Sequence, residues 1–405
     1  MSQSGTLILI MVIAVLAPLL AYGAGRWLPV PLVIFEIVLG IVVGPDVLGW
    51  ASSHGESIDA LSDLGLAMLI FLAGYEIEFD KIRGDTLKRS AWAWIVALVV
   101  GLGLAIALAD WSYPKGVYVG TALTSTALGT ILPVLRDSGD LHSRFGDVMM
   151  AFGAVGEFGP IIAMALLLSG RSPLDSALLL LAFAAITAFA VVWAMRPRPP
   201  WFSRVIAKTL HSSGQFAVRL VVLLLALMLG ASQALGVDTL LGAFAAGMIV
   251  RLVLHGAAPD SAHEVVAKVE AMGFGFLVPI FFIVTGIDFD LRSLLDGGKA
   301  LVLLPVFLVL FLVVRGVPVY FFAPDDLGGR DRTALTFFSS TALPLVVAIT
   351  TIGVEDGALP TDEAAALVGA AMVSVLVFPL IALKLRAGKG ARALPQGPVK
   401  GAESW

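Results

Sequence analysis

The chain has 405 residues and a formal net charge of −4; 59% of its residues are hydrophobic and only 14% are charged. A soluble protein of this length could not bury so much apolar surface, so the composition excludes a soluble protein and predicts a polytopic membrane protein. The chain contains no cysteine, which excludes disulfides, thiol catalysis and thiolate metal sites.

Thirteen apolar runs are long enough to cross a bilayer as helices. The first has no basic residue before it and no evident cleavage site, which indicates a true span rather than a signal peptide. The second and ninth are short and rich in glycine, so we expect them to be interrupted or steeply placed. The runs cover residues 5–25, 29–45, 61–79, 91–110, 115–135, 145–168, 174–195, 216–235, 239–255, 269–288, 300–322, 333–354 and 364–385.

The lysines and arginines between these runs and at their ends are distributed unevenly along the chain. Most of them follow an odd-numbered run, and those that follow an even-numbered run are Lys115, Arg171, Arg292 and Lys299. Because cytoplasmic loops collect Lys and Arg, we expect the N-terminus outside and the C-terminus in the cytoplasm. The protein is therefore expected in a cytoplasmic membrane, surrounded by lipid.

A polar segment, residues 196–215, divides the chain. Its apolar residues recur at helical spacing among basic residues, which fits a short helix in the inner headgroup layer; a solvated linker is the alternative. We expect residues 1–195 to hold a first repeat plus the seventh helix, and residues 216–385 to hold a second repeat. Residues 386–405 form a short cytoplasmic tail.

Short matches relate the two halves of the chain. The motif Ser-Thr-Ala-Leu occurs at residues 125–128 in the fifth run and at residues 340–343 in the twelfth, and similar acidic motifs end the third and tenth runs. The first six helices thus map onto the last six. Seven helices separate equivalent positions, and an odd number reverses the direction of crossing, so the repeat is inverted. Inverted repeats are typical of secondary transporters, whose site lies at the repeat interface near the membrane centre.

Glu157 lies near the middle of the sixth run, where a carboxylate is costly and usually marks an ion or proton pathway. A buried neutral acid, hydrogen-bonded to a neighbouring helix, is the structural alternative. Gly153, Gly156, Gly159 and Pro160 surround it, so we expect the backbone around Gly156 to be partly broken.

Two segments rich in serine and threonine, residues 121–133 and 336–351, lie in the fifth and twelfth runs. Gly129 and Pro133 follow the first cluster and Pro344 follows the second, and these residue types weaken or break a helix. We expect two discontinuous helices that meet antiparallel, whose free carbonyls and hydroxyls form a cation cradle. Close packing of small residues is the alternative. The expected cradle hydroxyls are those of Thr124, Ser125 and Ser340.

Four stretches carry a resemblance to a known family: PLVIFEIVLGIVVGPDVLG, LSDLGLAMLIFLAGYEIEFDKIR, LGAFAAGMIV and FLVPIFFIVTGIDFDLRSL. They resemble the membrane domain of the monovalent cation:proton antiporter-2 family, bacterial sodium or potassium/proton antiporters, and they span both halves. The resemblance implies a homodimer with a dimerisation domain and a moving core. It also implies that two crossed, broken helices bind the ion beside an acidic helix, through Thr124, Ser125, Thr126 and Glu157.

The chain departs from that family at the acidic position. The family commonly has two adjacent residues there, Asp-Asp or an amide followed by Asp, whereas this chain has Gly156 followed by Glu157. One carboxylate that holds either a proton or a cation suffices for antiport, so we expect electroneutral exchange.

Arg315, in the eleventh run, is the other charge expected within the membrane. The family often has a Lys or Arg on this helix that pairs with the acidic site when no cation is bound. The alternative is that the side chain of Arg315 extends to the cytoplasmic interface. Glu36 is expected to serve as a structural hydrogen-bonding partner; a place in the lining of the cytoplasmic funnel is the alternative. The remaining carboxylates near helix ends are expected on solvated faces: Glu76, Glu78, Asp80, Asp288 and Asp290.

Together these features predict a secondary antiporter that exchanges Na+ or K+ for H+. A non-transporting, ion-sensing homologue and a cation-coupled carrier of organic solutes are the alternatives. The sequence has no nucleophile–base constellation and no nucleotide-binding loop, so we do not expect an enzyme. We expect no cofactor, no metal beyond the transported cation and no nucleic-acid partner.

Overall fold

The computed structural model describes residues 3–24, 32–51, 55–76, 84–108, 112–141, 143–167, 173–194, 205–206, 208–210, 212, 214–236, 239–257, 259–295 and 298–387. Regular secondary structure in these residues is entirely helical. Every one of the thirteen runs contains helix, which confirms the expected architecture. Ten helices of the described part are long and apolar enough to cross a membrane.

The first half of the chain contains α1 to α8, and the segment corresponding to the fifth run is split into α5 and α6. α2 has only 12 residues. The helices are α1 (Gln3–Ala24), α2 (Leu32–Val43), α3 (Glu56–Glu76), α4 (Asp85–Leu108), α5 (Tyr113–Leu123), α6 (Leu128–Asp137), α7 (Arg144–Leu167) and α8 (Pro173–Ala194).

The second half repeats this order from α10 onward. Its third and fourth segments each contain a π-helical turn, η1 and η2, and its fifth is split into α17 and α18. The elements are α10 (Phe216–Leu235), α11 (Thr239–Ala257), α12 (Pro259–Met272), η1 (Gly273–Leu277), α13 (Val278–Ile287), α14 (Leu291–Leu295), α15 (Lys299–Leu310), η2 (Phe311–Gly316), α16 (Val317–Phe322), α17 (Gly329–Ser339), α18 (Pro344–Glu355) and α19 (Thr361–Ala387).

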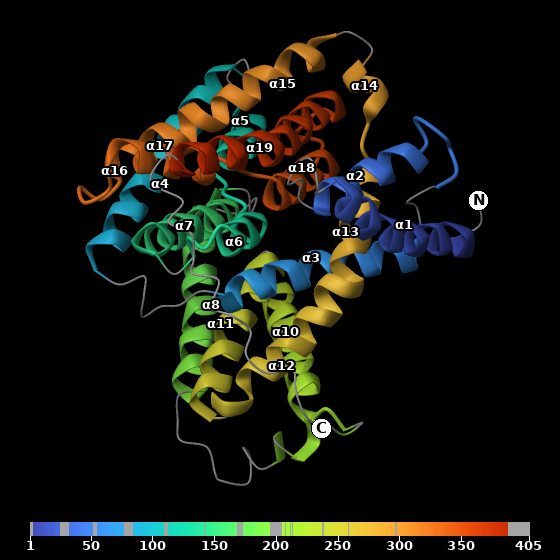
Figure 1. Ribbon diagram of the computed structural model, residues 1–405, viewed down its shortest axis with the longest axis vertical. Helices are drawn as coiled ribbons and strands as arrows, with labels where there is room; N and C mark the ends of the chain where they lie inside the picture. The colour runs from blue at the N-terminus through green and yellow to red at the C-terminus, as the bar shows by residue number, and fades with distance from the viewer. Residues whose placement is uncertain are drawn as a thin grey trace, which may run out of the picture.

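The helices form two groups (Figure 1). We call α4–α7 with α15–α19 the core bundle, because these helices pack on one another around both split segments. We call α1–α3 with α10–α13 the scaffold bundle, in which α3 packs on α11 and α2 packs on α13. In Figure 1, α10, α11 and α12 lie at the end of the molecule away from α15 and α19, and α8 runs beside them.

Two close contacts between glycines in the scaffold bundle occupy equivalent positions in the two repeats. A Cβ atom at Gly40 in α2 would lie 2.9 Å from Cα of Gly286 in α13. A Cβ atom at Gly247 in α11 would lie 3.0 Å from the carbonyl carbon of Gly74 in α3. Because α2 corresponds to α11 and α3 to α13, the same contact is made twice. This is the relation that an inverted repeat requires.

Some expectations about individual segments need correction or fall outside the described residues. The ninth run forms the continuous 19-residue helix α11 and is not interrupted. Most of residues 196–215 lies outside the described residues, and so does the tail beyond residue 387. Within the linker, Ile206 and Leu210 are buried in the protein.

The two breaks fall on the repeated Ser-Thr-Ala-Leu motif itself. Residues 124–127 separate α5 from α6, and residues 340–343 separate α17 from α18. Pro344 is the first residue of α18, a position in which proline is common. Gly129 and Pro133, in contrast, lie within α6, so the expectation that they form the first break is wrong. The hydroxyls of Thr124 and Ser125 bond to the last carbonyls of α5 instead, which competes with continuation of the helix.

α7 is one continuous helix, so the expected break at Gly156 is also wrong. Pro160 lies inside this helix and has no N–H to donate to the carbonyl of Gly156, four residues earlier. That carbonyl accepts the backbone N–H of Thr126 at 3.0 Å instead. The proline therefore leaves α7 intact and frees one acceptor for the first break.

Candidate functional site

The two breaks meet inside the core bundle. The N–H of Ala127 donates to the carbonyl of Thr341 at 2.7 Å, which joins one break to the other. The hydroxyl of Thr126 donates to the carbonyl of Ser339, the last residue of α17, at 2.6 Å. With the bond from Thr126 to Gly156, these contacts fasten both breaks to each other and to α7.

The hydroxyls expected to form the cradle are all buried, with exposed fractions of 0% for Thr124 and Ser340 and 1% for Ser125 and Thr126. Thr124 donates to the carbonyl of Thr121 at 2.8 Å and Ser125 to that of Ala122 at 2.7 Å. Because each hydroxyl gives its hydrogen to a carbonyl, its oxygen keeps lone pairs for another ligand. The buried Oγ of Ser340 has no hydrogen-bond partner among the described residues.

Glu157 lies in the middle of α7, one residue beyond Gly156, and is only 6% exposed. The described residues include no hydrogen-bonding or ion-pairing partner for its carboxylate, so they do not supply the neighbour that the structural alternative requires. Its charge lies within interaction range of one other carboxylate, that of Glu76 at the end of α3. A buried carboxylate in this setting is stabilised by binding a proton or a cation.

Arg315 is fully buried in η2, so its side chain does not reach the lipid–water interface. Its Nε donates to Oγ1 of Thr126 at 3.0 Å and its Nη2 to the carbonyl of Phe152 at 2.6 Å. Among the described residues it forms no ion pair with Glu157, the partner that the resemblance implies. Arg315 instead places a positive charge next to the first break, where the carbonyl ends of α5 and α17 face it.

Gly156 leaves room for this arginine. A Cβ atom at position 156 would overlap both Oγ1 of Thr126 and Nη2 of Arg315. The guanidinium thus fills the space that a side chain at the family's first acidic or amide position would occupy. The departure of this chain from the family pattern at position 156 therefore goes together with the position of Arg315.

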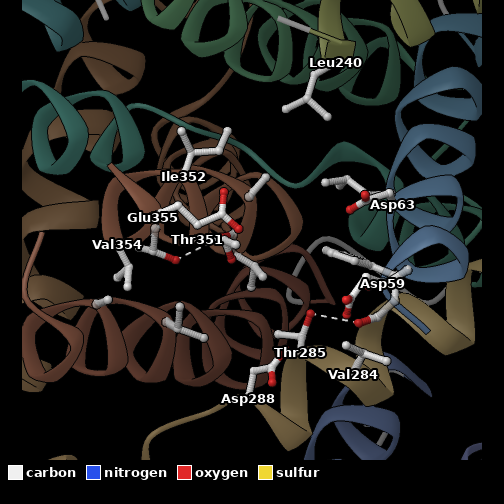
Figure 2. A pocket seen from close by; sticks show the side chains of 18 of the residues that line it. Asp59, Asp63, Leu240, Val284, Thr285, Asp288, Thr351, Ile352, Val354 and Glu355 are labelled. Atoms are coloured by element: carbon white, nitrogen blue, oxygen red, sulfur yellow. Dashed lines mark hydrogen bonds between the residues drawn. The ribbon is translucent and has the colours of Figure 1, made fainter. Parts of the chain in front are cut away.

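An acidic pocket of about 830 Å³ lies between the scaffold and core bundles. Figure 2 shows Asp59 and Asp63 projecting into it from α3 and Glu355 from α18. Asp288 and Asp290, after α13, also line it, whereas its described lining includes no lysine or arginine and does not include Glu157. The expectation that Asp288 and Asp290 serve only as solvated helix ends therefore missed this cavity.

The sequence carried a signal for this pocket. Asp59 and Asp63 are spaced i and i+4, so they share one face of α3, and Asp288 and Asp290 end the equivalent helix of the other repeat. Their convergence depends on α18 lying opposite, which no local pattern reveals.

Four other carboxylates stand out in the sequence: Glu36, Glu76, Glu78 and Asp80. Glu36 is 3% exposed in α2 and makes no hydrogen bond to another described residue, so its expected structural partner is not found there. Glu76 is half-buried, with Oε2 inside the protein, which corrects its assignment to a solvated face. Glu78 and Asp80 lie outside the described residues. No cluster of three or more potential metal ligands occurs in the described ranges.

A multi-pass helical membrane protein with repeated halves, two crossed discontinuous helices and a buried carboxylate beside them belongs to the class of secondary transporters. The family described as "Sodium/hydrogen exchanger, transmembrane" matches residues 11–383 of this chain. The chain therefore belongs to the sodium/hydrogen exchanger family, which confirms the resemblance seen in the sequence.

Individual relatives agree with this assignment. The chain is 26% identical to YjbQ of Bacillus subtilis over 94% of its own length and 62% of that protein. It is 26% identical to GerN of Bacillus cereus, named as an Na(+)/H(+)-K(+) antiporter, over 64% of its own length and 65% of that protein. The chain thus spans just under two thirds of both relatives.

A solved structure shares the fold. The sodium proton antiporter MjNhaP1 of Methanocaldococcus jannaschii superposes with a TM-score of 0.67, covering 96% of this chain and 100% of that structure. The sequence identity is 14%, so this likeness concerns the fold.

Proposed function

We propose that this protein is a secondary antiporter that exchanges Na+ or K+ for H+ by alternating access, with Glu157 binding the proton and the cation in turn. The single observation that carries the proposal is the burial of Glu157 beside the crossing of two broken helices, without a bonded partner among the described residues. A carboxylate held in this way favours whichever cation, H+ or a metal ion, can neutralise it.

The cation ligands would come from both breaks. Thr124 and Ser125 each offer a hydroxyl oxygen whose hydrogen is already donated, and Ser340 offers a buried oxygen from the second break. The hydroxyl of Thr126 already donates to the carbonyl of Ser339 and accepts from Nε of Arg315, so we assign Thr126 a positioning role. Oxygen atoms from hydroxyls, carbonyls and one carboxylate suit a hard monovalent cation.

The acidic pocket would serve as one of two access routes. The five carboxylates of its described lining would attract cations toward the interface of the two bundles. In the orientation favoured by the distribution of lysine and arginine, this pocket opens on the outer face of a cytoplasmic membrane. The resemblance further supports a homodimer in which the core bundle moves against the scaffold bundle.

The test is ion exchange by purified protein in proteoliposomes, with Na+, K+ and Li+ supplied in turn. We expect cation-dependent proton flux from the natural protein, and none from Glu157→Gln of equal purity and thermal stability. Glu56→Gln, the same chemical change at an exposed position of α3, serves as the matched control and retains exchange.

Normal exchange by Glu157→Gln would disprove the role of this carboxylate. If the natural protein moves no ion but is stabilised by one of them, the ion-sensing alternative is correct. If proton flux requires an added organic solute, the protein is a cation-coupled solute carrier.

A further inference from the structure

Ser374 lies in the middle of α19 and is fully buried beside the second break. Its Oγ accepts the backbone N–H of Ala342 at 3.1 Å. The same hydroxyl lies 2.7 Å from the carbonyl oxygen of Ala371, one turn earlier in α19, and 3.1 Å from that of Ala342, so it can donate its single hydrogen to either. This side chain therefore bonds α19 to the second break.

α7 and α19 are the sixth helices of the two repeats, and their sequences agree from an internal proline onward. Residues 160–164 read Pro-Ile-Ile-Ala-Met, and residues 379–383 read Pro-Leu-Ile-Ala-Leu. In this alignment Leu376 takes the place of Glu157. α7 is bonded to the first break through a backbone carbonyl, that of Gly156, whereas α19 is bonded to the second break through a side chain. Equivalent helices thus hold the two breaks in different ways.

The bonds between the two breaks are unequal as well. The alanine of the repeated motif is Ala127 in the first break and Ala342 in the second. The N–H of Ala127 donates to the carbonyl of Thr341, the threonine of the motif in the second break. The symmetric bond would run from Ala342 to the carbonyl of Thr126, but Ser374 accepts that N–H instead. Among the described residues, nothing donates to the carbonyl of Thr126, although this residue is only 1% exposed.

We infer that Ser374 is a positioning residue for cation binding, which acts through Ala342 and keeps the carbonyl of Thr126 available to the cation. A buried carbonyl without a donor is costly, and a bound cation would satisfy it. Thr126 follows directly on Thr124 and Ser125, whose hydroxyls are the proposed ligands, so the carbonyl belongs to the same cradle. Ser374 is not itself a ligand in this arrangement, because its hydroxyl already accepts one hydrogen and donates another.

The inference rests on the proposed antiport, because it concerns the same ion site. Without a hydroxyl at position 374, the N–H of Ala342 is left buried with no acceptor, and the carbonyl of Thr126 is the acceptor that the repeat offers. A bond between them would take this oxygen from the cation, while Glu157 could still bind a proton. The loss of Ser374 should therefore weaken cation binding and leave coupled exchange in place.

The experiment measures two quantities with the full chain, for Na+ and K+ in turn. One is the cation concentration for half-maximal exchange in proteoliposomes, and the other is the rise in melting temperature that the cation produces in the purified protein. We expect Ser374→Ala to raise that concentration about fivefold, equivalent to roughly 1 kcal/mol, with the maximal rate nearly unchanged. The same rise in melting temperature should then require more cation. Ser374→Thr keeps a hydroxyl and should restore most of the affinity.

Ser232→Ala in α10 is the matched control. Ser232 is likewise fully buried, and its Oγ donates to the carbonyl three residues earlier, that of Leu229, without bonding to either break. This variant should keep the natural cation concentration in both measurements, even where its own melting temperature falls. A lower melting temperature in Ser374→Ala with an unchanged cation concentration would mean that Ser374 has only a structural role, and would overturn the inference.

If Ser374→Ala does not fold, Ser374→Cys decides. A thiol is close to a hydroxyl in size but is a weak hydrogen-bond acceptor, so this variant should also need more cation, and an unchanged value would contradict the inference. Equal effects at positions 232 and 374 would contradict it too. A natural protein that exchanges no ion would instead count against the antiporter function itself, so the two failures are distinguishable.

Discussion

The guanidinium of Arg315 occupies the space in which any residue other than glycine at position 156 would place its Cβ atom. The arginine reaches this position because one face of η2 packs against α4 and α17, and it is held there by Thr126 and by the carbonyl of Phe152. A fixed positive charge thus stands beside Gly156, the residue before Glu157, where the family pattern would place a second acidic or amide side chain. The consequences can be tested at both residues.

Replacement of Gly156 by alanine should disrupt the site. The added methyl group overlaps Thr126 and Arg315, and both are held by hydrogen bonds at short range, so neither can move without breaking the crossing. Overpacking of this kind costs about 1–3 kcal/mol. We expect a lower melting temperature, followed by intrinsic tryptophan fluorescence, and a large loss of exchange.

Gly129→Ala is the matched control for this substitution. It lies in the first turn of α6 beside the same break, and a Cβ atom there meets nothing within 4 Å. The variant should be as stable as the natural protein and fully active. If both alanine variants behaved alike, the crowding argument for Gly156 would be wrong.

Arg315→Lys should keep the positive charge and lose the pair of hydrogen bonds that the guanidinium makes. Lysine presents one compact ammonium group, so it cannot bond to Thr126 and to the carbonyl of Phe152 along the same two directions. Loss of one charge-assisted hydrogen bond lowers the free energy of unfolding by about 1.5–3 kcal/mol. We expect reduced thermal stability and a slower maximal rate. Unchanged stability in Arg315→Lys would show that the charge alone matters.

The sequence predicted the thirteen helical segments because each is a long apolar run, a pattern that membrane insertion strongly constrains. It also located both breaks to within a few residues, since the same Ser-Thr-Ala-Leu motif occurs twice. The assignment of the first break to Gly129 and Pro133 was wrong. The hydrogen bonds from the hydroxyls of Thr124 and Ser125 determine where α5 ends. Such bonds depend on the local backbone, which residue type alone does not determine.

The contacts of charged residues were harder to foresee. Whether Arg315 faced lipid, Glu157 or a helix break depended on how η2 packs against two distant segments. The acidic pocket likewise arises from α18 lying opposite α3. Long-range packing of this kind leaves no periodic signal in any one run.

Removal of the cradle hydroxyls should weaken cation binding more than it alters folding. Thr124→Val and Ser125→Ala each remove one hydroxyl. Its hydrogen is donated to a carbonyl of α5, and its oxygen keeps lone pairs for a cation. Loss of one ligand should raise the cation concentration for half-maximal exchange about tenfold, or roughly 1.4 kcal/mol. Ser90→Ala, at a buried hydroxyl of α4 that bonds within its own helix, is the control. A stability loss in Thr124→Val with unchanged cation affinity would favour the packing alternative.

The acidic pocket should be open to water from one face of the membrane. The chain has no cysteine, so a single Glu355→Cys or Asp63→Cys change introduces a unique thiol without further engineering. We expect a membrane-impermeant maleimide to label both positions from the outside of intact cells, and Arg144→Cys, near the start of α7, only after permeabilisation. The opposite pattern would reverse the proposed orientation, and absence of labelling at both pocket positions would show that the pocket is closed in the membrane.

The proposed exchange should be electroneutral, one proton for one monovalent cation. Within the described part of the core bundle, Glu157 is the carboxylate beside the crossing, and the guanidinium of Arg315 keeps its charge throughout the cycle. The moving site therefore has the same net charge with a proton bound as with a cation bound.

A membrane potential then has no net charge on which to act. Each uncompensated elementary charge would instead contribute about 2.3 kcal/mol per 100 mV. We expect the same exchange equilibrium in vesicles clamped at two potentials, and no sustained current on a solid-supported membrane. A steady transport current, or an exchange equilibrium that shifts with the imposed potential, would mean that a second proton carrier exists and that the exchange is not electroneutral.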